Sequence, residues 1–536
     1  MQIVFVGCNA SVAEDVFIRT SQVGFLPSDV KTAVILSKKD LSNQLFFIVN
    51  TKSEDVVYKE MINDSSTVYG DFNYCYKIDF STVKQNGEYK VRVSDSESYP
   101  IKINDYIFNA IRDSLSLFFK VQRCGTTNPV LHQPCHLSDS YKLIGYKDSS
   151  ARDLTGGWHD AGDYIKFLKT TAYTTYLLMF SYQFDESKFS YDLNKNNVPD
   201  ILEEAKIGLD WLIRCNVNNE TLVVQVQDEN DHTVGWRLPE NDSLQFTRPA
   251  FVNIAKSTIG YYAATLALAS KIWKEKFYDD KFSEQCLIIA EKFYSLKDNV
   301  QDVDTTFSNH YPEKDFNGKL ALAAIELFNS TRKDQYLKDA LEYGEKAGAD
   351  FWWSVSDINS LAHFSIAKFN PEFANYIKQN LIQSLNHSNK ELYNEGLDYS
   401  WGTTNTFLGI SLQSLLYKKL TGSNEFDSLA IFQRDYVLGK NPWGISFIYN
   451  IGTKFSENLH SQIAFFNKGY LPGGLSAGPA PATILERYKI NHSDKSFSQF
   501  NSDMVKYSDD RMDFITNEPT IVGNATALFV FGCYSK

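Results

Sequence analysis

The sequence predicts a protein of two domains, a β-sandwich over residues 16–104 followed by an all-helical domain over residues 105–536. A chain of 536 residues is too long for one ordinary hydrophobic core. In the first part of the chain apolar and polar residues alternate, which is typical of half-buried strands. From Asp105 onward apolar residues recur with the helical period, and loops rich in Gly, Pro, Asn and Asp separate the periodic segments.

The predicted strands of the first domain are short and regularly spaced. Alternation is clearest at residues 32–36, 44–49 and 88–93. Asn86-Gly87 directly before the last of these segments favours a hairpin turn. Such spacing indicates a sandwich. No catalytic chemistry stands out in these strands, so we expect a supporting domain.

Residues 1–15 precede the first predicted strand and contain a short apolar run without basic residues ahead of it. Phe5-Val6-Gly7-Cys8 within this run resembles the cleavage box of a bacterial lipoprotein. We therefore expect either the remnant of an export signal or an unstructured tail. The former predicts an exported protein of bacterial type, whether periplasmic, attached to the cell surface or secreted.

About eleven segments of the second part are predicted to be helical. They span residues 106–122, 164–184, 198–215, 254–275, 282–296, 318–330, 335–350, 356–368, 371–385, 403–420 and 425–438. Helices joined by long polar loops imply paired helices around a core, with functional residues in the loops. The longest predicted non-helical stretch, residues 439–520, should form one wall of a cleft.

Composition narrows the class of ligand. The formal net charge is −12 without a basic block, which opposes binding to nucleic acid or to an anionic membrane surface. Aromatic residues make up 14% of the chain and suit stacking against flat ligands, sugars among them. No apolar run is long enough to span a membrane. Seven cysteines spread over a long chain do not indicate a disulfide scaffold.

Two carboxylates, Asp160 and Asp163, stand three residues apart in the glycine-rich stretch Gly156–Tyr164. Glycine lets a backbone turn tightly and approach a ligand, and helical residues follow directly. A pair of Asp residues in such a loop can hold a water molecule between them, as a general base requires. The alternative is a helix N-cap followed by a turn.

A second acidic run lies near the C-terminus, where Tyr507 and Asp509 precede Glu518. Glu518 alone, before Pro519, is typical of a solvated helix start, because Pro favours the first helical turn. Together with the stretch from Asp153 to Asp163, however, the run that continues to Asn524-Ala525 makes a specific pattern. The chain resembles glycoside hydrolase family 9, inverting β-glycanases that are mostly cellulases.

Further segments resemble the family more loosely, and the resemblance covers residues 106–536. They are Asn197–Ala205 with Leu209–Leu212, Trp236 to Pro249, Trp401 to Asn405, and Asp435–Pro442. Thr20–Pro27 is similar to the immunoglobulin-like domain that precedes many of these catalytic modules. The resemblance implies an immunoglobulin-like β-sandwich followed by an (α/α)6 barrel.

The resemblance also implies roles for three carboxylates: Asp163 as the base, Asp160 as a second holder of the water, and Glu518 as the acid. Inverting hydrolysis needs one carboxylic acid to protonate the leaving oxygen and one carboxylate to activate water opposite, roughly 6.5–9.5 Å away. The pKa of Glu518 would have to be raised by partial burial or by a neighbouring negative charge. No organic cofactor is expected.

Six residues are expected to bind substrate: His460, Gln462, Trp401, Trp236, Tyr507 and Asp509. His460 stands where the family has His-x-Arg, but Gln462 replaces the Arg and cannot supply its fixed positive fork. Tyr449 and Gly523 also depart from the pattern. These departures weaken the inference of cellulose specificity, although not that of the carboxylates. For His460, the alternative is a loop histidine without a role.

Two metal sites are predicted. Cys124, Cys135, His136 and His159 supply the ligands of a closed structural zinc site, and by resemblance family members with the immunoglobulin-like domain carry zinc at matching positions. Buried free cysteines are the alternative. Oxygen ligands with the spacing of an EF-hand calcium loop are Asp192, Asn194, Asn196, Val198, Asp200 and Glu203. An Asn-rich turn that caps the following helix is the alternative here.

We therefore expect an exported glycoside hydrolase that cleaves a β-1,4-glucan with inversion, of the endoglucanase type. An exo-acting β-glucosidase or β-glucosaminidase of the same family is the nearest alternative, motivated by Gln462. A carbohydrate-binding protein without catalysis, and a metal-dependent hydrolase that uses His159 and Asp160, are alternatives of other classes.

Overall fold

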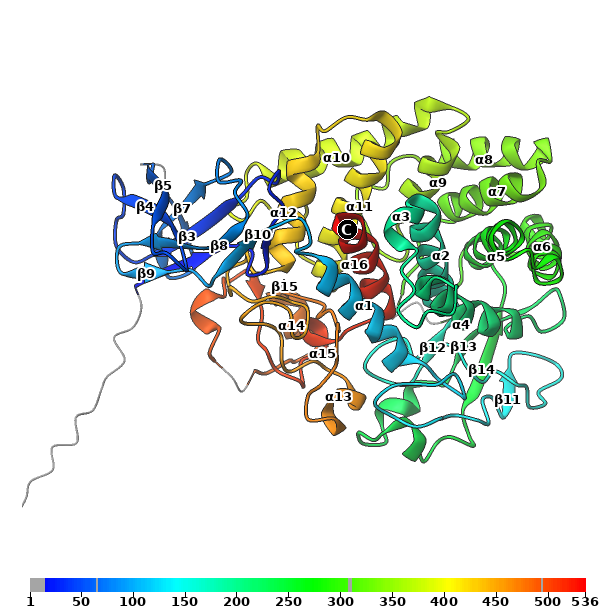
Figure 1. The fold of residues 1–536 in the computed structure, drawn as a ribbon. Coiled ribbons are helices and arrows are strands. Elements are labelled where there is room, and N and C mark those ends of the chain that lie inside the picture. The colour runs from blue at the N-terminus through cyan, green and yellow to red at the C-terminus, as the bar shows by residue number, and fades with distance from the viewer. Residues whose placement is uncertain (1–14, 64–65, 307–310, 493–494) are drawn as a thin grey trace, which may run out of the picture.

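The computed structural model describes residues 15–63, 66–306, 311–492 and 495–536. The expected export-signal remnant over residues 1–15 therefore lies outside the described residues, apart from Asp15. A strand-rich part ends at Ile103, and a helix-rich part begins at Asn109. Figure 1 shows the first part against one flank of the second, beside α12 (Asp427–Val437) and β15 (Ala480–Pro481). Within the described ranges, no helix is both long and apolar enough to cross a membrane.

The N-terminal part is a β-sandwich, as predicted. One sheet has the strand order β1-β3-β7-β6, and the other has the order β2-β10-β8-β4-β5 with β9 paired to β8. Most neighbouring strands are antiparallel, whereas β2 and β10 pair in parallel. The strands are β1 (Val16–Arg19), β2 (Gly24–Phe25), β3 (Thr32–Ser37), β4 (Leu45–Asn50), β5 (Val56–Met61), β6 (Thr67–Tyr69), β7 (Phe72–Asp79), β8 (Gly87–Val93), β9 (Ser96–Glu97) and β10 (Ile101–Ile103).

Strand β3 joins the sandwich to the helical part. Ala33 and Ile35 pack in the sandwich core, whereas Val34 and Leu36 on the opposite face belong to the core of the helical part. Side chains alternate between the two faces of a strand, so a strand that is buried on both faces appears as a continuous apolar run. The two parts therefore share a hydrophobic interface.

Polar contacts complete this interface. The backbone N–H of Gln22 donates to the carbonyl of Leu438 at 2.9 Å. Arg434, fully buried in α12 (Asp427–Val437), forms ion pairs of 2.8 Å with Asp29 of the sandwich and with Asp435. The two carboxylates thus balance the charge of the buried guanidinium, as a buried charge requires.

The helical part is an (α/α)6 barrel. Six inner helices form a ring in which each contacts the next, and the last contacts the first. They are α2 (Leu168–Phe184), α5 (Lys256–Phe277), α7 (Asn317–Thr331), α9 (Asn359–Ile366), α11 (Thr403–Thr421) and α16 (Ile521–Tyr534). Their outer partners, in the same order, are α4 (Asp200–Arg214), α6 (Asp280–Tyr294), α8 (Asp334–Ala347), α10 (Ala374–Ser388), α12 and α1 (Asn109–Gln122).

The eleven predicted helices are present, but sequence periodicity missed the twelfth helix of the barrel, α16. Twelve of its residues, Ile521–Gly532, are buried without a break, so no polar face marks the helical period. Among the described residues of the predicted non-helical stretch at 439–520, the only helices are the short α13 (Gln462–Phe466), α14 (Ala482–Arg487) and α15 (Phe514–Asn517), apart from a single 3-10 turn.

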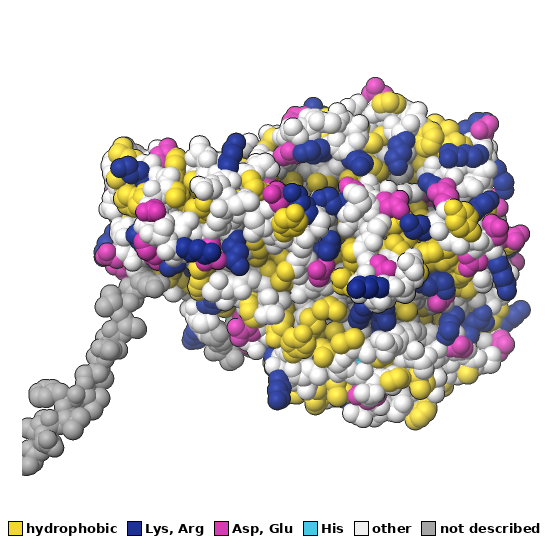
Figure 2. Space-filling view, viewed as in Figure 1, with side chains coloured by type: hydrophobic (Ala, Val, Ile, Leu, Met, Phe, Trp, Pro, Cys, Tyr) yellow, Lys and Arg dark blue, Asp and Glu magenta, His cyan; other side chains and the backbone are white. Residues whose placement is uncertain are grey.

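A small sheet within the loops of the barrel was not predicted. Its order is β11-β14-β13-β12, and it supports the segment that leads into α2. The strands are β11 (Lys142–Ile144), β12 (Lys166–Phe167), β13 (Leu222–Val226) and β14 (Pro249–Asn253). On the face of the molecule in Figure 2, basic and acidic side chains are interspersed, without a large patch of one sign.

Candidate active site

The structure brings Asp160, Asp163 and Glu518 together, although they lie far apart in the sequence of the helical part. Asp160 and Asp163 lie in the loop that leads into α2, and Glu518 lies between α15 and α16. The backbone N–H of Gly162 donates to Oε1 of Glu518 at 3.0 Å. The N–H of Ile521, the first residue of α16, donates to the carbonyl of Asp160 at 2.9 Å. Two neighbouring inner helices therefore hold the three carboxylates at one end of the barrel.

Gly162 is where these loops meet. A Cβ atom at this position would lie 2.0 Å from the carbonyl oxygen of His460, which explains why the chain has glycine here. The carbonyl of Gly162 accepts from the N–H of Gln462 at 3.0 Å, and the N–H of His460 donates to Asn517 at 3.0 Å. A third loop, residues 459–462, is thus fixed between the two carboxylate loops.

Asp160 is almost fully buried. Burial raises the pKa of Asp160 to about 7, although hydrogen bonds from Thr170 and Tyr311 act against this shift. The Tyr311 hydroxyl donates to Oδ2 of Asp160. One oxygen atom of Asp160 is therefore held by a hydrogen bond, whereas a carboxylate in a surface turn would be hydrated freely.

Asp163 pairs with a histidine. Oδ2 of Asp163 lies 2.8 Å from Nε2 of His232, and Oδ1 accepts from the N–H of Ile165 at 3.0 Å. The other ring nitrogen of His232 lies 3.0 Å from Oε2 of Glu229. The hydrogen bond to Asp163, with the charges of Asp163 and Glu229, raises the pKa of His232 to about 9. At neutral pH a cation therefore faces the Asp163 carboxylate.

Glu518 has the opposite electrostatic environment. Burial and then the charge of Asp163 raise the pKa of Glu518 well above its ordinary value, although the hydrogen bond from Gly162 lowers it. A raised pKa favours the protonated form of a carboxyl group, as a general acid requires. The neighbouring Asp163 faces His232, so the two carboxyl groups are suited to opposite roles.

Our sequence analysis missed Tyr311 and His232. His232 lies four residues before Trp236, where the segment that resembles the family begins, so its closeness to that segment was the available signal. Tyr311 lies 151 residues after Asp160, in a loop without a motif, so nothing in its sequence context indicated the contact.

Four of the six expected substrate-binding residues are at least partly exposed, namely Trp401, Trp236, His460 and Asp509. Trp401 is 42% exposed, and the centroid of its ring lies 5.7 Å from that of Phe514. The ring centroids of Phe514 and His460 are 5.9 Å apart. The His460 ring contacts Trp236 at 5.1 Å. These rings form a continuous aromatic row from Trp236 to Trp401. Asp509 is partly buried and accepts backbone N–H groups from Glu457 and Asn458.

The remaining two expected substrate contacts, Tyr507 and Gln462, are buried. Tyr507 is fully buried, and its hydroxyl contacts Asn517, the residue before Glu518, at 3.0 Å. Gln462 is 5% exposed, and its side-chain oxygen accepts from the N–H of Arg237 at 3.1 Å. Burial argues against direct sugar contact by Tyr507, and it leaves Gln462 occupied by an internal partner.

The predicted zinc ligands converge. One ligand atom from each of Cys124, Cys135, His136 and His159 lies within 4.8 Å of the others, and all four residues are buried. Nε2 of His136 lies 3.0 Å from Asp242, which leaves Nδ1 directed at the cluster. A carboxylate behind a ligating histidine is typical of zinc sites.

The sulfur chemistry of this cluster also fits a metal. Burial acts against ionisation, but the hydrogen bond with Cys135 and the charge of Lys166 lower the pKa of the Cys124 thiol well below its ordinary value, and the same hydrogen bond raises the pKa of Cys135. A thiolate is the form that binds zinc. Two sulfur and two nitrogen donors make a complete tetrahedral set, so an ion held here would leave no open position for chemistry.

The predicted calcium loop gathers around Glu203, in the first turn of α4. The side-chain amides of Asn194 and Asn196 donate to the two oxygens of Glu203. The backbone N–H of Asn197, which has φ of 68°, donates to Asp192 at 2.8 Å. Asp200 accepts from the N–H of Leu193. An ion bound here would require both side-chain amides to direct their oxygens at the ion instead of donating to Glu203.

A helical barrel with three carboxylates at one end, one suited to give a proton and one paired with a cation, defines a hydrolase of the acid–base type. Residues 108–531 match the model of glycosyl hydrolase family 9, and residues 14–98 match the cellulase N-terminal Ig-like domain. Because the first match covers most of the chain, the protein belongs to glycosyl hydrolase family 9 and is a glycoside hydrolase.

Similar proteins agree with this assignment. Endoglucanase D of Acetivibrio thermocellus is 25% identical, over 88% of this chain and 80% of the relative. Xyloglucan-specific endo-beta-1,4-glucanase BoGH9A of Bacteroides ovatus is 24% identical, over 96% and 93%. The crystal structure of a metagenome-derived family 9 endoglucanase superposes with a TM-score of 0.83 at 23% identity and covers 97% of this chain and 99% of that one.

Proposed function

We propose that this protein is an inverting endo-β-1,4-glucanase in which Glu518 is the general acid, Asp163 is the general base and Asp160 helps to hold the attacking water. The observation that carries the proposal is the contact of Gly162 with Glu518, because it couples the acid to the loop of both aspartates. The names of the two relatives above support a β-glucan as substrate.

In the proposed reaction, Glu518 protonates the glycosidic oxygen as the bond breaks. Asp163 takes a proton from a water molecule that attacks the anomeric carbon from the opposite face, which inverts its configuration. His232 pairs with Asp163 and keeps a positive charge beside the base. Tyr311 orients Asp160 by its hydrogen bond. The aromatic row of Trp236, His460, Phe514 and Trp401 is suited to stack on pyranose rings.

We assign structural roles to the two proposed metal ions. Zinc would be held by Cys124, Cys135, His136 and His159, where it would fix the loop that continues from His159 into Asp160. Calcium would bind the loop before α4, and thermal melting during calcium titration tests it. We also propose that the boundary between the two domains lies between residues 104 and 105, and that the protein is exported.

The first test is the anomeric configuration of the product. Proton NMR during cleavage of cellohexaose should show the α-anomer first, since inversion converts a β-linkage into an α-product. Initial appearance of the β-anomer would contradict the proposed mechanism. The sizes of the early products separate endo action, which gives a spread of oligomers, from the exo-acting alternative, which releases one small product.

The second test is Glu518→Gln. An amide oxygen can still accept from Gly162, so the fold should survive, but the general acid is lost. We expect kcat to fall by about 10²–10⁴-fold. Glu486→Gln, at an exposed site in α14, is the matched control and should keep full activity. Unchanged turnover of Glu518→Gln would show that Glu518 is not the general acid, and absence of turnover in the unmodified protein would favour a carbohydrate-binding protein without catalysis.

A further inference from the structure

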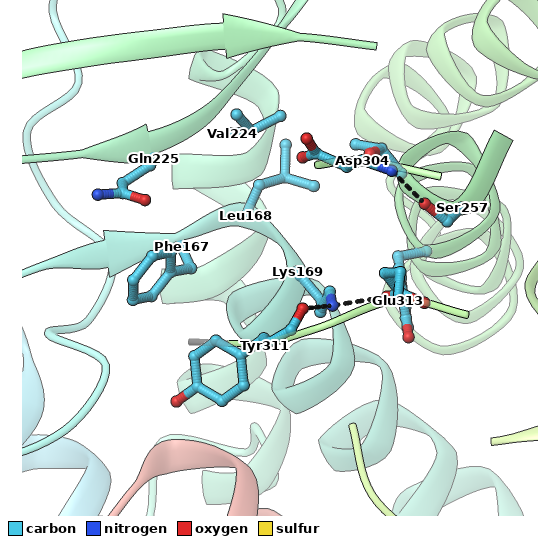
Figure 3. A pocket seen from close by; sticks show the side chains of 11 residues that line it. Phe167, Leu168, Lys169, Val224, Gln225, Ser257, Asp304, Tyr311 and Glu313 are labelled. Atoms are coloured by element: carbon cyan, nitrogen blue, oxygen red, sulfur yellow. Dashed lines mark hydrogen bonds and ion pairs between the residues drawn. The ribbon is translucent and has the colours of Figure 1, made fainter. Parts of the chain in front are cut away.

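A small pocket lies beside Tyr311, and both polar and apolar side chains line it. Its volume is about 40 Å³, and its walls include Gln225 of β13, Ser257 of α5, Tyr311 and Glu313. Figure 3 shows Lys169 between Tyr311 and Glu313, with interactions to both. The contacts that hold the segment with Tyr311 matter for catalysis, because its hydroxyl donates to Asp160.

Lys169 supplies such a contact from the first turn of α2. Its Nζ donates to the carbonyl oxygen of Tyr311 at 2.7 Å and pairs with Oε1 of Glu313 at 2.6 Å. The helix that carries Lys169 is the one that the Asp160–Asp163 loop leads into. Asp160 and the backbone of Tyr311 are therefore tied to the same end of one inner helix.

A second lysine completes the arrangement. Lys319 of α7 lies 3.1 Å from Oε2 of Glu313 and donates to the carbonyl of Asp315 at 3.0 Å. The Glu313 side chain is 1% exposed, and those of Lys319 and Lys169 are 3% and 16% exposed. Two lysines thus share one carboxylate in a nearly water-free environment.

We propose that Lys169 is a positioning residue that acts through Tyr311: it fixes the Tyr311 backbone so that the phenol orients Asp160 towards the attacking water. The inference rests on the proposed role of Asp160. It adds a residue that contacts neither the substrate nor the three catalytic carboxyl groups. No step of the reaction passes through Lys169.

The charge balance selects the variant for the test. Lys169→Met removes the ammonium and keeps most of the apolar stem, and it leaves Glu313 paired with Lys319 as a neutral pair. Glu313→Gln would instead leave two buried lysines without their carboxylate, which is costly. Lys169→Met is therefore the variant that separates positioning from folding, and Lys169→Gln, with a shorter neutral side chain, replaces it if Met does not fold.

The experiment is a double-mutant cycle on a soluble cello-oligosaccharide. We expect Tyr311→Phe to lower kcat about tenfold, and Lys169→Met to lower it about fivefold with KM unchanged. In the Tyr311→Phe background, Lys169→Met should cause less than about a twofold further loss, since the phenol it positions is gone. Lys169→Arg, which keeps the charge and the donors, should restore most of kcat.

Losses that multiply in the double variant, or an unchanged kcat of Lys169→Met, would overturn the inference while leaving the proposed reaction intact. Full activity of Glu518→Gln would overturn the proposed reaction itself. Lys31→Met is the matched control, because Lys31 is also buried and donates to two backbone carbonyls at 2.9 Å, but in the sandwich. It should lower the melting temperature without changing kcat.

Discussion

At the scale of single residues, the site depends on how neighbouring groups divide protons among three carboxyl groups. Glu518 faces the charge of Asp163, whereas Asp163 faces the imidazole of His232. Carboxyl groups in such different environments can act as acid and base at the same pH. The ordering depends on contacts between residues that are far apart in the chain.

His232→Gln should move the alkaline limb of the pH profile. Burial and the charge of Asp163 raise the pKa of Glu518, and the His232 cation opposes them. Without this cation Glu518 should keep its proton to a higher pH, so the loss of kcat/KM on the alkaline side should begin at higher pH. A pH series of kcat/KM checks this. A limb that stays in place or moves to lower pH would contradict it, and His387→Gln on outer helix α10 is the control.

At the scale of elements, the loop of Asp160 and Asp163 is fixed from several sides. The cysteine and histidine cluster lies directly before it in the chain, since His159 precedes Asp160. Glu518 and α16 hold it from the C-terminal end, through Gly162 and Ile521. A loop held in this way can keep two carboxylates in one geometry without a helix or strand of its own.

Removal of the proposed zinc should act on stability before it acts on turnover. A structural metal contributes folding free energy, so chelation should lower Tm by several degrees, while molecules that remain folded keep their kcat. Calorimetry and activity on the same samples, with metal content measured, check this. Cys135→Ser should reproduce the effect, and Cys286→Ser, at another buried cysteine, is the control. Immediate loss of turnover at unchanged Tm would favour the metal-dependent hydrolase.

At the scale of the whole molecule, the sandwich and the barrel behave as one packed body at their interface. The outward face of β3 lies in the core of the barrel, and Arg434 of the barrel pairs with Asp29 of the sandwich. Buried apolar contact and a compensated buried charge both disfavour separation.

Leu36→Ala should therefore destabilise the catalytic part, although Leu36 lies in the sandwich. Truncation of a buried leucine costs about 2–5 kcal/mol of the free energy of unfolding. We expect a lower Tm with unchanged kcat at room temperature, measured by thermal melting and by assays well below Tm. Leu45→Ala, at a 40% exposed position of the same sandwich, is the control. Equal melting temperatures of the two variants would contradict a shared interface.

The sequence by itself determined the architecture, because local periodicity marks strands and helices and family motifs indicate how they are arranged. Alternation in residues 88–93 predicted a strand, and helical periodicity predicted eleven of the twelve barrel helices. The twelfth, α16, escaped because a helix buried on all sides has no polar face to mark its period. The two motifs also identified the three carboxylates that the fold brings together.

Tertiary structure alone decided the surroundings of those carboxylates. Tyr311 reaches Asp160 from a loop without a motif, and burial makes Tyr507 a support for Asn517. A pKa depends on desolvation and on charges within a few ångströms, and these are set by chain segments hundreds of residues apart. Glu518 meets Gly162 across 356 residues, so no local pattern could predict the environment of the acid.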